Sequence, residues 1–300
     1  MFEINRSSLV LFGLEIRWYG VLIALGVLGA VLLALKREKQ LGLKKDTTLN
    51  LALICVPVGV ICARLYYVIF SWDYYSAHPG EILNLRSGGL AIYGAVIGGA
   101  LAALIYAKVG KTSFASIADL IAPGLAFGQA VGRWGNFLNQ EAYGALVENP
   151  ALHFFPVSVY IEGSGWHWAT FFYESIWCAM ICAALLILEG KGKFRKRGDV
   201  FLSYAFLYAL ERCVVEGLRS DSLYLGPFRV SQLLSFAALI VLAVLLAFRG
   251  KHRPLLQRLL PVCFAVMLLF QWNILLSILL AAAALFAAAK LYFEIIDPEM

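Results

Sequence analysis

The sequence contains few of the features that mark a soluble protein or a metalloprotein. Only 15% of its 300 residues are charged, whereas about a quarter are charged in soluble domains, and 61% are hydrophobic. The four histidines and six cysteines form neither a CxxC pair nor a spacing suited to a metal ion. We therefore expect a multi-pass membrane protein that has no metal site and no cofactor.

Several other signals are also missing. The chain starts with an acidic Glu3 and lacks a basic n-region and a cleavage site, so we expect no removable signal peptide. No internal repeat and no soluble domain are recognisable in the chain. The net charge of +6 could suggest nucleic acid, but Lys and Arg cluster in short runs between apolar segments. Such runs indicate membrane topology, and we expect no nucleic-acid partner.

Seven apolar segments predict membrane helices, and hence an all-α bundle, within residues 1–253. Residues 254–300 add a further hydrophobic segment of open role. Its apolar run, Leu259–Ala289, would be ~46 Å long as one helix, longer than the ~30 Å hydrocarbon core. It is either one tilted helix or two limbs broken near Gln271. The seven segments are Trp18–Leu35, Leu49–Phe70, Gly89–Ala107, Ile117–Val131, Ala169–Leu188, Val200–Val215 and Val230–Phe248.

Glycine spacing and composition predict how the segments pack and connect. Small residues recur every four positions in the third segment, at Gly94 and Gly98, and in the fourth segment, from Gly124 to Gly132. This spacing permits close helix contact, and we expect these two helices to pack backbone to backbone. Residues 1–17 are expected to form a short amphipathic lead, and residues 145–168 a polar-aromatic loop without periodicity.

The distribution of basic residues predicts the orientation of the chain. The loops after the first, third, fifth and seventh segments hold most of the Lys and Arg, which assigns them to the cytoplasm and places the N-terminus outside. On the opposite, outer side every basic residue is an arginine. These residues are Arg6, Arg17, Arg86, Arg133, Arg212, Arg219 and Arg229.

The stretch from Gly132 to Gly144 is the most unusual part of the chain. It reads GRWGNFLNQEAYG and follows an apolar segment without a polar spacer. Charge at that membrane depth usually faces a polar cavity or a partner, and the glycines allow a backbone turn or the close approach of a ligand. The alternative is an ordinary helix exit with a solvated loop.

Further charged side chains are predicted near the same membrane face. Arg212, Glu216 and Arg219 are spaced i, i+4 and i+7, which puts them on one helix face. Arg64 lies in the outer half of the second segment, and Glu174 lies near the outer start of the fifth. Because the planar guanidinium binds phosphate through two hydrogen bonds, this set suggests a phospholipid headgroup. Structural Arg–Glu pairing between helices is the alternative.

Gly132–Gly144 resembles the signature of the prolipoprotein diacylglyceryl transferase family of bacteria. Some members have a histidine, proposed as a base, where this chain has Tyr93, so the resemblance does not imply a histidine base here. Other stretches resemble the family in the same order, from about residue 15 to 240. They are Trp18–Gly20, Ala63–Tyr67, Gly88–Gly94, Asp119–Pro123, Phe172–Ser175, Arg212–Arg219 and Gln232.

The resemblance implies a specific reaction. The family transfers the diacylglyceryl group of phosphatidylglycerol to the cysteine thiol of the lipobox in a preprolipoprotein signal peptide. This first step of bacterial lipoprotein maturation forms a thioether and releases glycerol phosphate. The resemblance also implies a multi-pass protein of the bacterial cytoplasmic membrane, surrounded by membrane lipids, with its active site toward the outer face. Anion transport, another lipid-headgroup transferase and a scaffold with structural ion pairs are the alternatives.

The expected site residues fall into two groups. Arg133 and Arg212 are expected to bind the phosphate and stabilise its developing charge, and Glu141 and Glu216 to orient the arginines or to take the thiol proton. Tyr93 lines the cavity or is simply packed. The expected catalytic residues are Arg133, Arg212, Glu141, Glu216 and Tyr93, and the expected substrate-binding residues are Arg133, Asn136, Tyr19, Arg64, Asn139, Gly144, Glu174 and Arg219.

Overall fold

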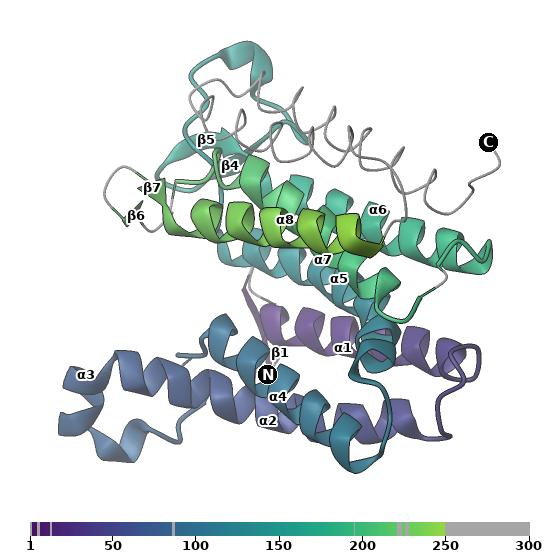
Figure 1. Cartoon of the computed structure of the whole chain (residues 1–300). Helices are drawn as coiled ribbons and strands as arrows, with labels where there is room; N and C mark the ends of the chain where they lie inside the picture. The colour runs from purple at the N-terminus through teal and green to yellow at the C-terminus, as the bar shows by residue number, and fades with distance from the viewer. Residues whose placement is uncertain are drawn as a thin grey trace. The chain divides into compact units, whose positions relative to one another are not determined.

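The computed structural model describes residues 2–4, 7–12, 14–85, 88–194, 196–220, 224–225 and 228–249, which are mostly helical (Figure 1). They form two compact units. The first comprises the described residues up to Ala30 and from Ala122 onward, and the second is Val31–Ile121. The expectations for residues 254–300 lie outside the described residues.

The predicted apolar segments form helices in the described part of the chain. Five of these helices, α1, α2, α4, α5 and α6, are long and apolar enough to cross a membrane, as expected of a multi-pass protein. Helix α7 has 17 residues. In α8, the stretch Val230–Leu242 forms a shorter apolar helix than the five spans. The helices are α1 (Trp18–Glu38), α2 (Thr47–Phe70), α3 (Trp72–Ala77), α4 (Ile92–Val109), α5 (Phe114–Asn139), α6 (Thr170–Gly190), α7 (Asp199–Val215) and α8 (Val230–Arg249), with 3-10 turns η1 (Pro79–Glu81) and η2 (Pro150–Leu152).

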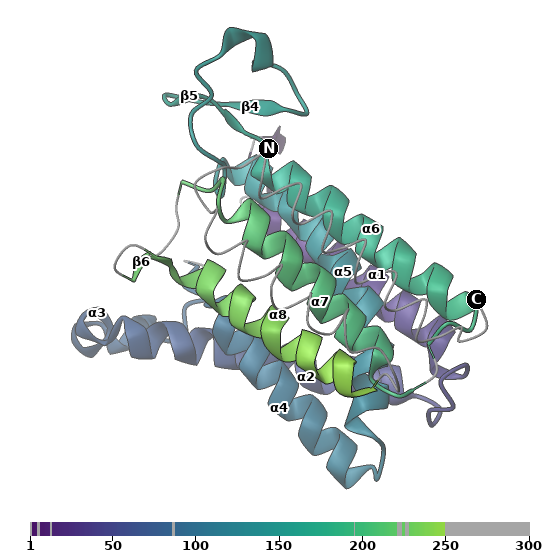
Figure 2. The same ribbon diagram turned by 45° about the horizontal axis from the view of Figure 1, so that its top comes forward.

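The expectation of an all-α fold is confirmed only in part, because two connecting segments contain β-strands. Residues 1–17 contain an antiparallel three-stranded sheet in the order β1-β2-β3. Residues 145–168 contain the hairpin β4-β5, which is seen in Figure 2. Alternation of apolar and charged residues over Leu14–Arg17 is a strand pattern, although it is short. The strands are β1 (Phe2–Ile4), β2 (Ser8–Leu11), β3 (Leu14–Arg17), β4 (Ser158–Ile161), β5 (Gly165–Trp168), β6 (Tyr224–Leu225) and β7 (Phe228–Arg229).

The glycine rows permit close helix contacts, but the expected pairing of the third and fourth segments is wrong. In the second unit, a Cβ at Gly94 of α4 would lie only 2.3 Å from the carbonyl oxygen of Cys62 on α2. In the first unit, a Cβ at Gly124 of α5 would lie 2.9 Å from Cβ of Ala30 on α1. A row of small residues allows backbones to approach closely but carries no information about which helix approaches.

In the first unit, α7 contacts both α6 and α8 along its length (Figures 1 and 2). The indole Nε1 of Trp177 on α6 donates to the Leu207 carbonyl, 3.1 Å away, and Nε2 of Gln232 on α8 donates to the Cys213 carbonyl at 3.0 Å. Leu210 of α7 is fully buried. These contacts fix the rotation of α7, and with it the direction of its charged side chains.

Candidate active site

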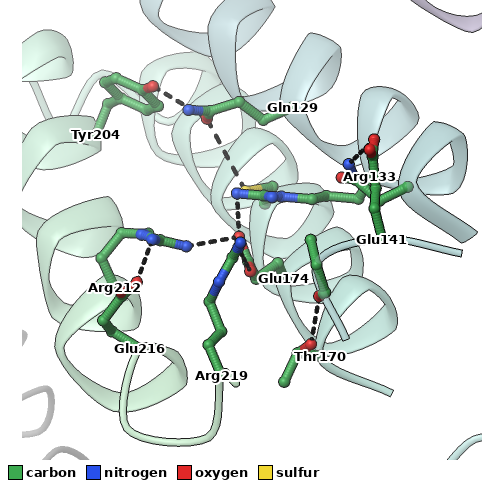
Figure 3. Close-up of polar contacts among 12 residues, drawn as sticks. Gln129, Arg133, Glu141, Thr170, Glu174, Tyr204, Arg212, Glu216 and Arg219 are labelled. Carbon is green, nitrogen blue, oxygen red and sulfur yellow. Dashed lines mark hydrogen bonds and ion pairs between the residues drawn. The ribbon is translucent and has the colours of Figure 1, made fainter. Parts of the chain in front are cut away.

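Glu174, near the start of α6, is the centre of a cluster of charged side chains. It has no exposed surface. Its Oε2 pairs with Arg133 of α5 and lies 3.1 Å from Nη1 of Arg212 on α7, and its Oε1 lies 3.4 Å from Nη1 of Arg219 in the turn after α7. Figure 3 shows the three arginines converging on this one carboxylate from different elements.

Glu216 holds the cluster from the other side of Arg212. Its Oε2 pairs with Nη2 of Arg212, and its backbone carbonyl accepts a hydrogen bond from Nη1 of Arg229. Burying these charges is tolerable because each is paired, yet Arg133, Arg212 and Arg219 outnumber the two carboxylates. The arginine side chains are 13–20% exposed, so an anion can reach this positive cluster.

The signature stretch is helical, which corrects the expectation that the fourth segment ends at Val131. Helix α5 continues to Asn139, and the chain turns at Gln140 and Ala142, whose φ angles are 52° and 56°. Glycine inside a helix costs only about 1 kcal/mol, so it is compatible with a helix where close packing needs it. A Cβ at Gly135 would lie 2.2 Å from Cδ2 of Tyr19 on α1.

Glu141 lies at the exposed edge of the site, just after α5. Its Oε1 accepts hydrogen bonds from Nδ2 of Asn136, at 2.9 Å, and from Nδ2 of Asn139, at 3.4 Å. The Tyr19 phenol interacts electrostatically with Glu141 and with Arg133. Glu141 thus orients two asparagines, whereas Glu174 and Glu216 orient the arginines.

Gly144 is a close crossing point between three segments. Its N–H donates to the Trp168 carbonyl of β5 at 2.9 Å, and its carbonyl lies 2.8 Å from Nδ1 of the buried His167. The next N–H, of Ala145, donates to the Leu218 carbonyl at 2.8 Å. The hairpin and the turn that carries Arg219 are therefore joined at the end of the signature stretch.

Replacing Gly144 with alanine is expected to destabilise the protein by about 1–3 kcal/mol and to lower activity, because overpacking shifts the backbone. The new Cβ would lie 2.6 Å from Cβ of Trp168 and 2.9 Å from the Leu218 carbonyl oxygen. Thermal unfolding in detergent measures the change. Gly99→Ala is the control, since among the described residues nothing beyond its own stretch of helix lies within 4 Å of its Cβ position. Equal stability of the two variants would contradict the crossing-point role.

Comparison with known proteins assigns the chain to a family. The family model described as prolipoprotein diacylglyceryl transferase matches residues 7–248. The chain belongs to this family. The phosphatidylglycerol–prolipoprotein diacylglyceryl transferase of Clostridioides difficile (strain 630) is 44% identical over 236 residues, which cover 79% of this chain and 92% of the relative. The enzyme of the same name from Bacillus cytotoxicus is 42% identical over 255 residues, covering 83% and 93%.

Membership of the prolipoprotein diacylglyceryl transferase family confirms the expected activity. The protein is a membrane transferase of lipoprotein biosynthesis that carries out the first step of lipoprotein maturation. The charged cluster around Glu174 lies within the matched residues, whereas residues 254–300 lie beyond them.

Two residues expected in the substrate site belong to the second unit. Arg64 is buried, and its guanidinium donates to the carbonyls of Ile82, Gly88, Gly89 and Glu81 at 2.7–3.0 Å. This network favours a structural role for Arg64 over phosphate binding. The Tyr93 side chain is 49% exposed, and its ring packs at a tilt against that of Tyr66, with centroids 6.4 Å apart. This geometry is compatible with both expectations for Tyr93, lining a cavity and packing.

Arg64→Ala is expected to destabilise the protein by about 3–5 kcal/mol, because four part-buried carbonyls lose a charged donor. Arg64→Lys should rescue little, since an ammonium cannot reproduce the planar fork. Unfolding in detergent and the KM for lipid are measured together. A raised KM without any loss of stability would instead support substrate binding by Arg64.

The structure also brings polar residues to the site that sequence reasoning missed. Oε1 of Gln129, one turn before Arg133 on α5, accepts a hydrogen bond from the hydroxyl of Tyr204 at 3.0 Å and lies 3.9 Å from Sγ of Cys178 (Figure 3). Glu211 directly precedes Arg212. A signal for both residues was present in the sequence. Each is a polar or acidic residue inside an apolar segment, within one helical turn of an arginine expected in the site.

Proposed function

We propose that the protein transfers the diacylglyceryl group of phosphatidylglycerol to the lipobox cysteine of a preprolipoprotein signal peptide. The names of two relatives contain both the lipid phosphatidylglycerol and the word prolipoprotein. The main support within the structure is the convergence of Arg133, Arg212 and Arg219 on the buried Glu174. Such a cluster suits a lipid phosphate, because guanidinium groups bind its oxygens in pairs.

The reaction balances without any redox partner. The cysteine sulfur attacks the glycerol carbon that carries the phosphate, and the bond between that carbon and the phosphate oxygen breaks. The electron pair stays on the oxygen, so a phosphate diester with one negative charge becomes a monoester with two. The thiol proton leaves to a base. Fixed arginines lower the barrier because they stabilise charge that grows in the transition state without having to reorganise.

The positions of the carboxylates suggest separate roles. Glu174 and Glu216 are buried and paired, so they hold Arg133 and Arg212 in place for the phosphate. Glu141 is exposed and held by Asn136, so it can meet the thiol of an incoming peptide and take its proton. The activated nucleophile is then the thiolate.

The topology forms part of the proposal. Helices α7 and α8 are assigned as the sixth and seventh membrane spans, and residues 1–253 as the catalytic domain. The excess of Lys and Arg in alternate loops puts the N-terminus outside and the site toward the outer face of the bacterial cytoplasmic membrane. A site there can receive lipid and signal peptide laterally from the bilayer. No cofactor takes part in the proposed reaction.

A transfer assay tests the proposal. Purified protein in detergent is incubated with phosphatidylglycerol and a synthetic lipobox peptide that has one cysteine, and peptide mass and released glycerol phosphate are followed. The expected result is a diacylglyceryl mass gain with one glycerol phosphate per modified peptide, and no gain when alanine replaces the cysteine. Release of glycerol phosphate without peptide modification would point to a lipid hydrolase instead.

A further inference from the structure

Glu211 of α7 is a buried carboxyl group without a hydrogen-bond partner in the part of the chain that the structure describes. Only 3% of the residue is exposed, and among the described residues neither Oε1 nor Oε2 has a hydrogen-bond partner. A buried carboxylate that lacks a hydrogen-bond donor costs several kcal/mol, so native structures rarely keep one without a purpose. A carboxyl group accepts hydrogen bonds in either protonation state, which points to a ligand that brings a donor.

Helical spacing places Glu211 on the side of α7 that faces the charged cluster. Tyr204 and Tyr208 precede it by seven and three residues, so the three side chains share one face. The Tyr204 hydroxyl donates to Gln129 of α5, which shows that this face points toward α5. Glu211 also interacts electrostatically with Glu174 and with Arg133, Arg212 and Arg219.

We propose that Glu211 accepts a hydrogen bond from a hydroxyl of the glycerol headgroup of phosphatidylglycerol and so selects for a polyol headgroup. This inference rests on the proposed function. The headgroup glycerol is bonded directly to the phosphate, so it lies beside the arginines when they hold the phosphate. Its hydroxyls are the donors that Glu211 lacks, and a buried acceptor discriminates strongly against an analogue without them.

The direction of attack explains why Glu211 meets the headgroup rather than the thiol. Displacement at carbon is in line, so the sulfur and the departing phosphate oxygen lie on opposite sides of the carbon. Glu211 is adjacent in sequence to Arg212 and interacts with all three arginines, which places it on the phosphate side. The thiol therefore approaches from the other side, away from Glu211.

Two lipids of equal charge separate headgroup recognition from phosphate binding. Phosphatidylglycerol is compared with phosphatidyl-1-propanol, which has the same phosphodiester but no headgroup hydroxyl. The wild-type enzyme is expected to prefer phosphatidylglycerol by about 10²-fold or more in kcat/KM. Glu211→Leu should lose most of this preference, chiefly because it uses phosphatidylglycerol more slowly. Glu211→Gln keeps one acceptor, so its preference should lie between those of the wild type and Glu211→Leu. Glu148→Gln, an exposed loop variant, should keep it.

Stability provides a second readout. Because Glu211→Leu removes an unsatisfied buried carboxyl, its unfolding temperature in detergent should equal or exceed that of the wild type. An equal fall of kcat/KM for both lipids, or an unchanged preference, would overturn the inference, as would a wild-type enzyme that does not distinguish the lipids. No transfer from either lipid by folded wild-type protein would instead refute the proposed function.

Discussion

Arg212→Ala lowers the rate of diacylglyceryl transfer by about 10²–10³-fold or more, while the protein stays folded in detergent. Arg212 contacts both Glu174 and Glu216, so it is the link between the two carboxylates of the cluster. Removing one fixed donor to a developing negative charge has an effect of this size in other enzymes. The rate is measured with saturating lipid and peptide, and folding by thermal unfolding of the same sample. Arg133→Ala should behave in the same way.

Two further variants sharpen this prediction. Arg212→Lys keeps the charge but loses the planar fork, so it should recover only a small part of the activity. Arg17→Ala removes an exposed arginine at the end of β3 and should leave the rate unchanged. Near-normal turnover by Arg212→Ala would show that the phosphate is bound elsewhere.

Glu174→Gln is expected to reduce both activity and stability. The amide has nearly the same shape but no charge, so Arg133, Arg212 and Arg219 lose the carboxylate that holds them together. Breaking a buried ion pair by removing one partner costs about 3–5 kcal/mol. We expect transfer to fall by at least about 10²-fold, because arginines that must reorganise stabilise the transition state poorly. Unfolding temperature and kcat are measured on the same preparation.

A double-mutant cycle tells positioning from direct contact. If Glu174 acts by holding Arg133, then Glu174→Gln and Arg133→Ala together should lower kcat by little more than either change alone. Fully additive losses would mean that Glu174 acts independently of this arginine. Glu148→Gln serves as the matched control, because it removes an exposed carboxylate outside the cluster.

The helical framework and part of the site could be predicted from local sequence. Apolar segments locate helices because a membrane span must be long and continuous, and α7 begins within one residue of its predicted start at Val200. The spacing of Arg212 and Glu216 sufficed to predict that they face each other, since residues four apart on a helix are neighbours.

Features that depend on tertiary contacts could not be predicted in this way. Glu174 carries no local signal that it binds three arginines, because they come from other parts of the chain. From sequence alone, Gly135 could end a helix or allow a neighbouring side chain to approach. The structure shows the second, because the Tyr19 ring packs directly against it. The hydrogen-bonding of Arg64 likewise depends on carbonyls well removed in sequence, such as that of Gly89.

The central claim is that the arginine cluster fits the charge that grows on the departing phosphate. We would therefore measure inhibition of transfer by glycerol 1-phosphate and by its methyl diester at one pH near 8. The monoester carries about two negative charges there and the diester one. If the site is complementary to the transition state, the monoester should inhibit about tenfold more strongly, and Arg212→Ala should remove that advantage. Equal inhibition by the two compounds in the wild-type enzyme would contradict the account.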